Sequence, residues 1–408
     1  MAPPSLLELE EARGRVLARV APLDGEPVPL REALGRRLAE NVASEEPVPA
    51  FDNSAMDGFV LRAEDTGAAS PGAPARLRLV DESRAGAPAA RALAAGEAMR
   101  ISTGAAVPAG ADAVLRVEEA RLDDGHLLVE AAVAPRHDVR GAGEDVAPGT
   151  TLLRAGTALG PAELGVLAAI GRPQVSCHRR PRVAVLTSGD ELVEPGEPLR
   201  PGMVRNSNSY TVPALAELAG AAVTVAGPAP DRAEATREAL APLLEADVVV
   251  VCGGVSVGEH DHVKGALAEL GVEEEFWGVA LKPGRPTWFG RRGETLVFGL
   301  PGNPVSAMVT FQLLVRPAIV ALAGGDPDRQ RTWARLAGDY EKRPGRIHAL
   351  RCRLELREDG WWAHPFPRQG SHVLTSMLKA DCLALLPTEA GPAAAGDRVE
   401  IELLEACR

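Results

Sequence analysis

The stretch 247–270 limits the possible folds of this chain more than any other part of the sequence. Val248–Cys252 is a short β-branched run, which is typical of a strand covered on both faces. A turn with Gly253, Gly254 and Gly258 follows, and a helix is predicted from about residue 260 to 270. Glycines let the backbone approach a ligand closely, and a helix N-terminus favours negative charge. The stretch therefore predicts an α/β fold with an anion-binding turn.

The same turn also carries two acidic residues, Glu259 and Asp261, which would repel a bound phosphate. A divalent cation between the carboxylates and the phosphate would remove this conflict. The alternative is an ordinary strand-to-helix connection, in which Asp261 is a first-turn acid favoured by the helix dipole. No lysine-serine pair follows the glycines, so the turn is not a Walker P-loop.

Residues 182–300 repeat the order strand, turn, helix, which predicts an α/β domain with a mainly parallel sheet. The predicted strands include Val183–Leu186, Val223–Val225 and Thr295–Leu300, and Asp231 opens a predicted helix. In such sheets ligands bind beyond the carboxyl ends of the strands. Besides the glycine turn, the expected rim contains Thr187, Ser188, Gly189, Asp190, Glu191, Pro301, Gly302 and Asn303. Lys282 and Arg285, in the sequence LKPGRP, add positive charge beside it.

The segments around this unit have different patterns and predict further domains. Residues 45–138 hold short alternating pieces between glycine- and proline-rich turns, which indicates a small β domain. The helix predicted from Pro161 is expected to pack with the N-terminal helix, so that residues 1–44 and 139–176 form one discontinuous helical domain. The α/β domain then covers residues 177–327, and residues 328–408 return to alternation as a second β domain.

Charge and composition exclude several classes of function. A formal net charge of −12 argues against nucleic acid or an anionic membrane as the main partner. We find no basic-apolar leader and no apolar run of spanning length, so a cytoplasmic location is expected. The five cysteines are scattered without paired spacing, which argues against a disulfide framework or a zinc knuckle.

Taken together, several motifs resemble one known family. The motifs are FDNSAMDGF (51–59), RGAGEDV (140–146), LTSGDELVEPG (186–196), GGVSVGEHDHVK (253–264), KPGRP (282–286), GLPGNPVSA (299–307) and QGSH (369–372). In this order they resemble the MoeA-type molybdopterin molybdenumtransferases, the family that includes the E domain of gephyrin. The resemblance implies an α/β and β multidomain fold in which a discontinuous helical domain, a small β domain and a molybdopterin-binding α/β domain precede a C-terminal β barrel.

The resemblance also implies an activity and an assembly. The family takes adenylylated molybdopterin and molybdate, releases AMP, and leaves molybdenum on the pterin dithiolene. It forms a homodimer whose pocket combines the α/β domain of one subunit with the small β domain of the other. Expected partners are the molybdopterin adenylyltransferase and the enzymes that accept the cofactor. Molybdate and tungstate share charge and nearly share size, so the sequence does not decide between them.

Individual site residues follow from the resemblance as expectations. Catalytic roles fall on Asp57, Thr103, Asp145, Glu191, Asp231 and Asp261, with Mg²⁺ bound by Asp231 and Asp261. Pterin binding falls on Thr187, Ser188, Gly189, Asp190, Gly253, Gly254, Ser256, Gly258, Lys264, Lys282, Gly284, Arg285, Pro301, Gly302 and Asn303. Molybdate is expected at Lys282, Ser306, Arg351 and Ser371. His260 and His262 flank Asp261, where relatives are expected to carry a small residue and a tyrosine; either histidine would join the metal shell or stay solvated.

Structural alternatives exist for several of these residues. Asp231, with Glu234 three residues later, also fits a helix cap. The polar residues of FDNSAMDGF also fit Asx turns. Arg351 would otherwise be a solvated strand residue and Ser371 a turn former. At the level of function, the α/β unit alone resembles the adenylyltransferase that acts one step earlier, although that enzyme needs neither β domain. A non-catalytic molybdopterin-binding scaffold is the other alternative, although the chain has no long linker to a second module.

Overall fold

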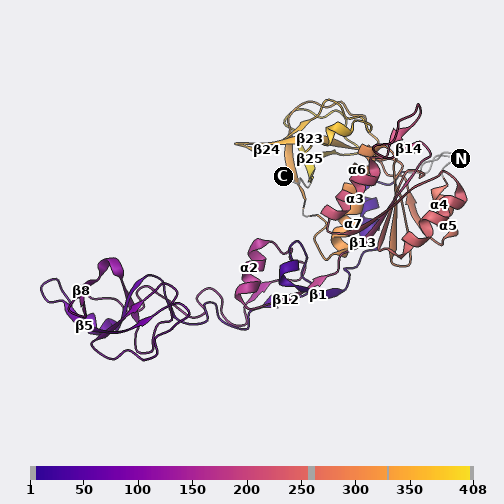
Figure 1. Cartoon of the computed structure of the whole chain (residues 1–408). Coiled ribbons are helices and arrows are strands. Elements are labelled where there is room, and N and C mark those ends of the chain that lie inside the picture. Colours follow the sequence, from indigo (N-terminus) through magenta and orange to yellow (C-terminus); the bar gives the residue numbers. More distant parts are fainter. Residues whose placement is uncertain (1–5, 256–261, 329, 405–408) are drawn as a thin grey trace.

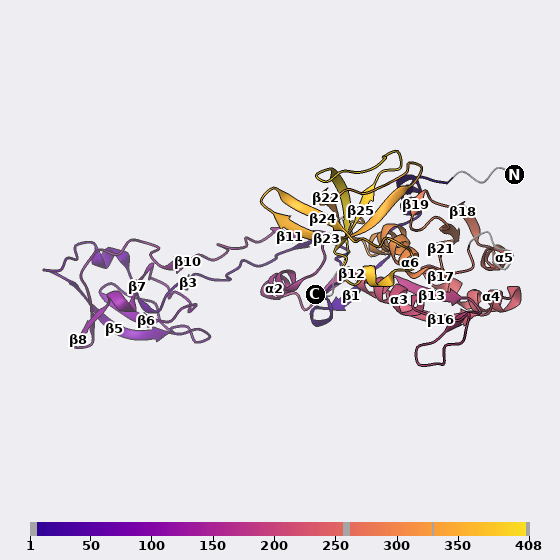
Figure 2. The ribbon, with the colours of Figure 1, turned by 90° about the horizontal axis from the view of Figure 1, so that it is seen from above.

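The computed structural model describes residues 6–255, 262–328 and 330–404. The molecule is elongated (Figures 1 and 2): a small β domain lies at one end, and the α/β domain and the C-terminal barrel lie together at the other. Extended segments and a small intermediate unit around α2 (Pro161–Ala169) connect the two ends. The chain is therefore multidomain, as predicted.

The α/β domain is built on a six-stranded sheet with the order β16-β13-β17-β21-β20-β18. The neighbours β16 (Ala222–Ala229), β13 (Arg182–Ser188), β17 (Val248–Cys252) and β21 (Thr295–Leu300) pair in parallel. β20 (Trp288–Arg292) and β18 (Glu273–Trp277) complete the sheet in antiparallel pairing. Every residue of β17 is buried, because helices cover both faces of the sheet at this strand.

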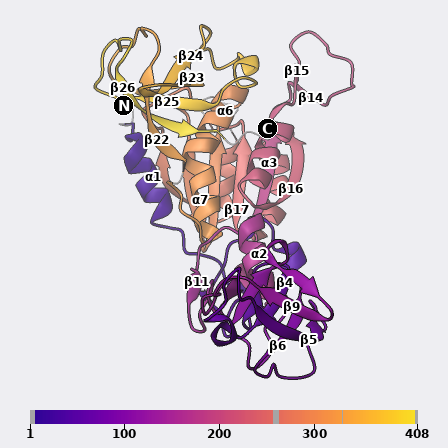
Figure 3. The same cartoon turned by 90° about the vertical axis from the view of Figure 1, so that its left-hand side faces the viewer.

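Two groups of helices cover the two faces of the sheet (Figure 1), and Figure 3 shows the group with α3, α6 and α7. One face carries α3 (Asn208–Leu218) and a continuous segment formed by α6 (Pro304–Thr310), η5 (Phe311–Val315) and α7 (Arg316–Leu322). The other face carries α4 (Ala233–Leu240), η4 (Ala241–Glu245) and α5 (Val263–Glu269). The segment Pro304–Leu322 is long and apolar enough to cross a membrane, contrary to our expectation that no such run exists, but 89% of it is buried inside the fold. We interpret it as the core helix of this domain.

The N-terminal helix α1 (Leu9–Leu17) packs on the α/β domain, contrary to our expectation that it would pack with α2. The physical reason is its apolar stripe, because Leu9, Ala12 and Val16 are buried in the same core as η5 and α7. The discontinuous unit is instead joined by strand pairs. β1 (Gly25–Pro29) pairs with β12 (Gln174–His178), and β2 (Val42–Ala43) pairs with β11 (Thr151–Leu153), next to η1 (Leu30–Glu32) and α2.

The small β domain consists of one six-stranded sheet with the order β7-β4-β6-β5-β9-β8. Its strands are β4 (Gly58–Leu61), β5 (Ala75–Ser83), β6 (Glu97–Ile101), β7 (Ala113–Arg116), β8 (Arg121–Asp123) and β9 (His126–Val129), with short turns η2 (Ala63–Thr66) and η3 (Val117–Glu119). The chain enters beside β3 (Asn53–Ser54) and leaves beside β10 (Val139–Arg140), and these two strands pair. Entry and exit of this domain are therefore neighbours.

The C-terminal domain is a closed five-stranded barrel, as predicted. Its strands are β22 (Arg331–Leu336), β23 (Ile347–Arg357), β24 (Gly360–Pro365), β25 (Cys382–Leu386) and β26 (Arg398–Leu403), and the pairing of β23 with β25 closes the ring. η6 (Leu374–Ser376) precedes β25, and β19 (Leu281–Lys282) adds to the start of β23. The α/β domain thus contributes a strand to the barrel sheet.

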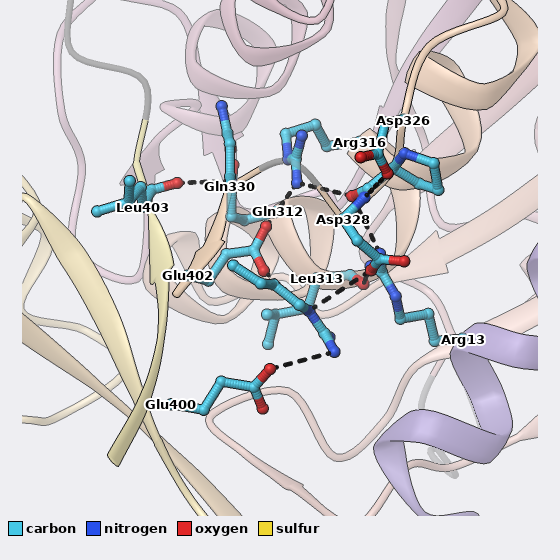
Figure 4. A network of polar contacts seen from close by, with 12 residues as sticks. Arg13, Gln312, Leu313, Arg316, Asp326, Asp328, Gln330, Glu400, Glu402 and Leu403 are labelled. Carbon is cyan, nitrogen blue, oxygen red and sulfur yellow. Dashed lines mark hydrogen bonds and ion pairs between the residues drawn. The ribbon is translucent and has the colours of Figure 1, made fainter. Parts of the chain in front are cut away.

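A buried polar network joins α1, the core helix and the barrel (Figure 4). Arg316 of α7 donates to Glu402 of β26 over 2.5 Å, and Arg331 of β22 donates to the same carboxylate over 3.2 Å. Arg13 of α1 donates to the Leu313 carbonyl over 3.3 Å and also pairs with Asp328. Charges buried in this way are tolerated because each is paired.

Candidate functional site

A cavity of about 690 Å³ lies at the carboxyl ends of the four parallel strands. Three turns and one acid surround it. At the end of β13 and just after it the lining residues are Thr187, Ser188, Gly189 and Glu191; after β17 they are Gly253, Gly254 and Val255; after β21 they are Pro301, Gly302, Asn303 and Pro304; and Asp231 follows β16. The parallel pairing brings these distant segments to one edge, where α/β folds bind ligands.

The glycine turn has a backbone that admits no side chain at two positions. Gly253 has φ +95°, and a Cβ atom there would lie 2.6 Å from the Ser188 carbonyl oxygen. Gly254 has φ +66°, and a Cβ atom there would lie 2.4 Å from Val263 Cγ2. The Gly253 N–H donates to the Leu300 carbonyl over 3.0 Å, so it ties β17 to β21 instead of facing a ligand. The predicted residues Ser256, Gly258, His260 and Asp261 lie outside the described residues.

Asp231 is held at the cavity rim by the first turn. Its carboxylate accepts hydrogen bonds from Ser188 Oγ over 3.0 Å and from the Asp190 N–H over 3.3 Å. The Asp231 N–H in turn donates to Asp190 Oδ1 over 3.2 Å. The alternative interpretation as a helix cap is wrong, because α4 begins at Ala233, its N-cap position is Arg232, and no side chain caps it. The carboxylate of Asp231 is therefore positioned toward the cavity by β13.

Two asparagines of the cavity wall were missed by our reading of the sequence. Asn206 donates to Thr187 Oγ1 over 3.0 Å, and Asn208 donates to the Gly302 carbonyl over 2.9 Å. Asn208 Oδ1 is buried and has no hydrogen-bond partner among the residues that the structure describes. The sequence RNSNS at the start of α3 carried a usable signal, because asparagines and serines are common at helix starts and in turns.

The barrel contributes His372 to the cavity, from the QGSH segment. Arg351 does not line the cavity, and it is 0% exposed instead of solvated. Its guanidinium donates to Ser376 Oγ over 3.1 Å and to the Gly370 carbonyl over 3.1 Å. The Ser371 carbonyl accepts from the Val305 N–H over 3.2 Å, which joins this segment to the start of α6. Arg351 thus holds the segment that carries His372.

The remaining predicted ligand residues do not line the 690 Å³ cavity. Lys282 lines a different cavity at the end of the barrel. The Lys264 ammonium lies 5.3 Å from the centre of the Trp277 ring. A Cβ atom on Gly284 would lie 2.6 Å from Thr310 Oγ1. Arg285 and the buried Ser306 are not among the residues that line the cavity, although Pro286 is.

The motif residues of the small β domain gather on their own exposed face. Asp57 Oδ1 accepts a hydrogen bond from the Thr103 N–H over 2.7 Å. Asp52 accepts from the Ala142 N–H over 2.8 Å, and this bond, followed by the bond from Arg136, lowers the pKa of Asp52. Asp57, Thr103 and Asp145 are exposed, and the domain lies at the far end of the molecule (Figure 2). Within one chain these residues do not line the cavity.

The oxygen donors at the cavity suit a hard cation. Asp231 and Glu191 both line the wall. Within the described ranges no three His, Cys, Asp or Glu side chains form a metal-binding group. Cys252 also lines the cavity, but burial raises the pKa of its thiol to about 12, so it is not a thiolate ligand at neutral pH. Carboxylates that are completed by phosphate oxygens and water are typical of magnesium.

Three family profiles match successive parts of the chain. The MoeA N-terminal region, described as domains I and II, matches residues 7–171. A probable molybdopterin-binding domain matches residues 184–321. The MoeA C-terminal region, described as domain IV, matches residues 333–404.

Individual proteins match over nearly the whole length. The molybdopterin molybdenumtransferase of Haemophilus influenzae is 37% identical over 408 residues, which cover 97% of this chain and 98% of the relative. The enzyme of the same name from Bacillus subtilis is 33% identical over 404 residues, or 98% of this chain and 94% of the relative. The crystal structure of the molybdopterin biosynthesis MoeA protein from Pyrococcus horikoshii matches with a TM-score of 0.86 at 33% identity, covering 98% of this chain and 100% of that one.

Proposed function

Because this chain belongs to the MoeA family of molybdopterin molybdenumtransferases, we propose that its 690 Å³ cavity holds adenylylated molybdopterin while molybdenum is inserted. The chain is a transferase of molybdenum cofactor biosynthesis. The observation that carries the cavity assignment is the meeting of three turns and Asp231 at one edge of the parallel sheet. The release of AMP as the second product is part of the proposal.

The wall of the cavity offers mostly neutral groups to such a ligand. The missing side chains of Gly253 and Gly254 let the glycine turn pack directly against Ser188 and Val263, which fixes the backbone of this wall. Asn208 Oδ1, which is buried without a described partner, offers an acceptor to the N–H groups of a pterin. We infer that the turns orient the ligand so that its phosphates lie beside Asp231.

We further propose that Mg²⁺ binds between these phosphates and Asp231, with Asp261 as the second acid. Asp231 and Glu191 fit this ion because magnesium takes oxygen ligands and usually needs only one or two carboxylates in addition to phosphate and water. When bound, the ion would neutralise the negative charge that develops as the pyrophosphate bond breaks. The hydrogen bonds from Ser188 and from the Asp190 N–H keep the Asp231 carboxylate at the rim for this purpose.

The substitution Asp231→Asn tests the assignment. Asparagine keeps the size of the side chain and one acceptor for Ser188 but removes the charge, so turnover at limiting magnesium should fall at least about tenfold while the fold is kept. Glu238→Gln is the matched control, because Glu238 is an exposed carboxylate on α4, the helix that follows Asp231. The assay is AMP release from adenylylated molybdopterin with and without molybdate. Unchanged turnover of Asp231→Asn would remove the metal role, ATP consumption would indicate an adenylyltransferase, and an inert protein would indicate a scaffold.

We propose that the active unit is a homodimer with two shared pockets. The support is the separation within one chain: Asp57 and Thr103 contact each other on the small β domain, which lies at the opposite end of the molecule from the α/β domain, Asp145 lies on the segment that leads from the small β domain, and none of the three lines the cavity. A second copy in the opposite orientation would bring its small β domain to that cavity. An isologous arrangement of this kind is the commonest form of oligomer.

Mixing two inactive variants tests the shared pocket. When Asp57→Ala and Asp231→Asn chains exchange freely, a mixed dimer has one pocket with both residues intact, so about a quarter of wild-type activity should return. The control is a mixture of Asp231→Asn with Asp231→Ala, which should stay inactive. An absence of recovery in the first mixture, despite exchange proven by mass spectrometry, would place the pocket within a single chain.

We place the reaction in the cytoplasm. The support is that the four cysteines in the described part of the chain, Cys177, Cys252, Cys352 and Cys382, are free and buried, as is common in a reducing compartment. The expected protein contacts are with the adenylyltransferase that supplies the adenylylated pterin and with the enzymes that receive the cofactor. Molybdenum content of the product under equal supply of molybdate and tungstate decides which oxyanion is preferred.

A further inference from the structure

A second cavity of about 380 Å³ lies at one end of the barrel, where the segment between β22 and β23 meets β19. It shares no lining residue with the larger cavity among the described residues. Its ionisable lining residues are Lys282, Glu341, Lys342, Arg343, Arg346 and His348. Cationic side chains thus outnumber the acid on this wall of a chain whose net charge is −12.

Two of these groups are buried, which distinguishes the cavity from a patch of surface lysines. His348 is 5% exposed, and its Nδ1 atom is buried with no hydrogen-bond partner in the described part of the chain. Lys342 is 3% exposed, and its Nζ donates to the carbonyls of Thr388 over 3.1 Å and of Ala390 over 2.8 Å. A buried polar atom without a partner is rare in folded proteins, and His348 is one of the residues that line the cavity.

Three further cations are available to such a ligand. Lys282 lies beside His348, because β19 and β23 pair in parallel with these two residues in register. Arg343 and Arg346 lie on the segment before β23. Across residues 6–255, 262–328 and 330–404, no acidic side chain forms an ion pair with Lys282, Arg343 or Arg346. Guanidinium groups bind tetrahedral oxyanions through paired N–H donors.

The electrostatics of His348 agree with an anion in this place. Burial, followed by the charges of Lys282, Lys342 and Arg346, lowers the pKa of His348 to about 4. The ring is therefore neutral at neutral pH and keeps one N–H donor, while the charge comes from the surrounding lysine and arginine side chains. A cavity with this wall repels cations, and Pro344 is its one apolar lining residue among the described residues.

We propose that the barrel cavity is a second anion site, which binds a small tetrahedral dianion through Arg343, Arg346, Lys282 and His348. The dianion is either a free oxyanion, such as molybdate or sulfate, or the phosphate group of a monoester. The family resemblance implies a molybdate site at Lys282, Ser306, Arg351 and Ser371. Of these four residues, only Lys282 lines the barrel cavity. The site is defined by its own residues and stands without the function proposed for the larger cavity.

Direct binding to the full-length chain tests the site. Equilibrium dialysis with labelled molybdate and sulfate, and separately with glycerol 3-phosphate, measures the affinity of both sources of the dianion. We expect Arg343→Gln and Arg346→Gln each to weaken binding of the preferred probe at least about tenfold, because each removes a charged donor. Arg353→Gln is the matched control, since Arg353 is an exposed arginine on β23, the strand that follows Arg346, and does not line the cavity; it should leave the affinity unchanged.

Two additional measurements keep the test independent of folding and of turnover. The ring of His348, followed by NMR, should become more basic when the dianion binds, and this response should be absent in Arg346→Gln. Asp231→Asn should retain dianion binding even if it loses transferase activity, which separates this site from the larger cavity. The proposal is overturned if the wild type binds none of the three probes. It is also overturned if the Arg343→Gln and Arg346→Gln variants bind the preferred probe as strongly as the wild type does.

Discussion

Replacing Glu402 by leucine should destabilise the junction between the α/β domain and the barrel more than almost any other single exchange. Glu402 is 0% exposed and accepts from Arg316 over 2.5 Å and from Arg331 over 3.2 Å. The side chain of Arg316 is only 4% exposed. Without the carboxylate, Arg316 keeps a long contact of 3.4 Å to the Pro327 carbonyl, and its Nε atom already lacks a described partner.

The magnitude follows from the cost of a buried charge without its partner. Removing one member of a buried ion pair costs about 3–5 kcal/mol, whereas replacing both members by apolar groups of similar volume is often nearly neutral. Glu402→Leu alone should therefore lose about 3–5 kcal/mol, and Arg316→Met combined with Glu402→Leu should recover most of that loss. Glu400→Leu is the control, because its side chain is 34% exposed and 3.7 Å from Arg331, and should cost less than about 1 kcal/mol.

The assay is urea unfolding followed by tryptophan fluorescence and by hydrogen exchange of the β26 amides. Trp333 is a suitable reporter, since it pairs across the strands with Glu400 in the same part of the barrel. Because the chain has several domains, the exchange data are needed to assign the transition to the barrel. The reasoning is refuted if Glu402→Leu lowers the free energy of unfolding by less than about 1 kcal/mol. It is also refuted if the loss in the double variant equals the sum of the losses in Arg316→Met and Glu402→Leu.

Three other expectations concern acid, the glycine turn and the barrel segment. The pKa of His348 in the folded state, about 4, lies below its ordinary value of 6.5. The neutral ring therefore contributes to the free energy of unfolding above pH 6.5. At most about 3 kcal/mol of this free energy is lost as the pH falls from 6.5 through 4. Urea midpoints between pH 7 and 4 should show this loss in the wild type and less of it in His348→Gln. Gly254→Ala should lower the free energy of unfolding by about 1–3 kcal/mol because of the positive φ and the contact with Val263. Gly265→Ala in α5, where a methyl group would meet open space, should raise it by about 0.5–1 kcal/mol in the same denaturation assay. Arg351→Met should raise hydrogen exchange at residues 368–372 and weaken pterin binding through His372, and Arg351→Lys should restore part of both; equal exchange in all three proteins would contradict the positioning role.

The cavity edge was accessible from sequence because local patterns determine it. The valine run before Gly253 marks a strand that is buried on both faces, and parallel strands must end at the same side of a sheet. Thr187, Ser188, Asp231 and the Pro301–Asn303 turn therefore met as predicted. These conclusions need only the direction of each strand.

The parts that sequence did not yield depend on partners far away in the chain. Arg351 is buried because the Gly370 carbonyl and the Ser376 hydroxyl accept hydrogen bonds from its guanidinium, and no local pattern shows that these acceptors will be there. The position of α1 depends likewise on the distant core of η5 and α7, which buries its apolar stripe, and on the Leu313 carbonyl, to which Arg13 donates. The proposed anion site of the barrel combines β19 with the segment before β23. Nothing in the local sequence of either segment predicts that the two lie side by side.

The small β domain is attached in a way that bears on how such a chain could arise. The two connecting segments that lead to it run antiparallel and contact each other at successive points. The neighbouring pairs are Val42 and Leu153, Ser44 and Thr150, Val48 and Val146, and Asn53 and Arg140. The polypeptide thus departs from the host fold and returns to it at adjoining positions. A segment with this topology can be gained, lost or exchanged as a unit without rethreading the remainder of the chain.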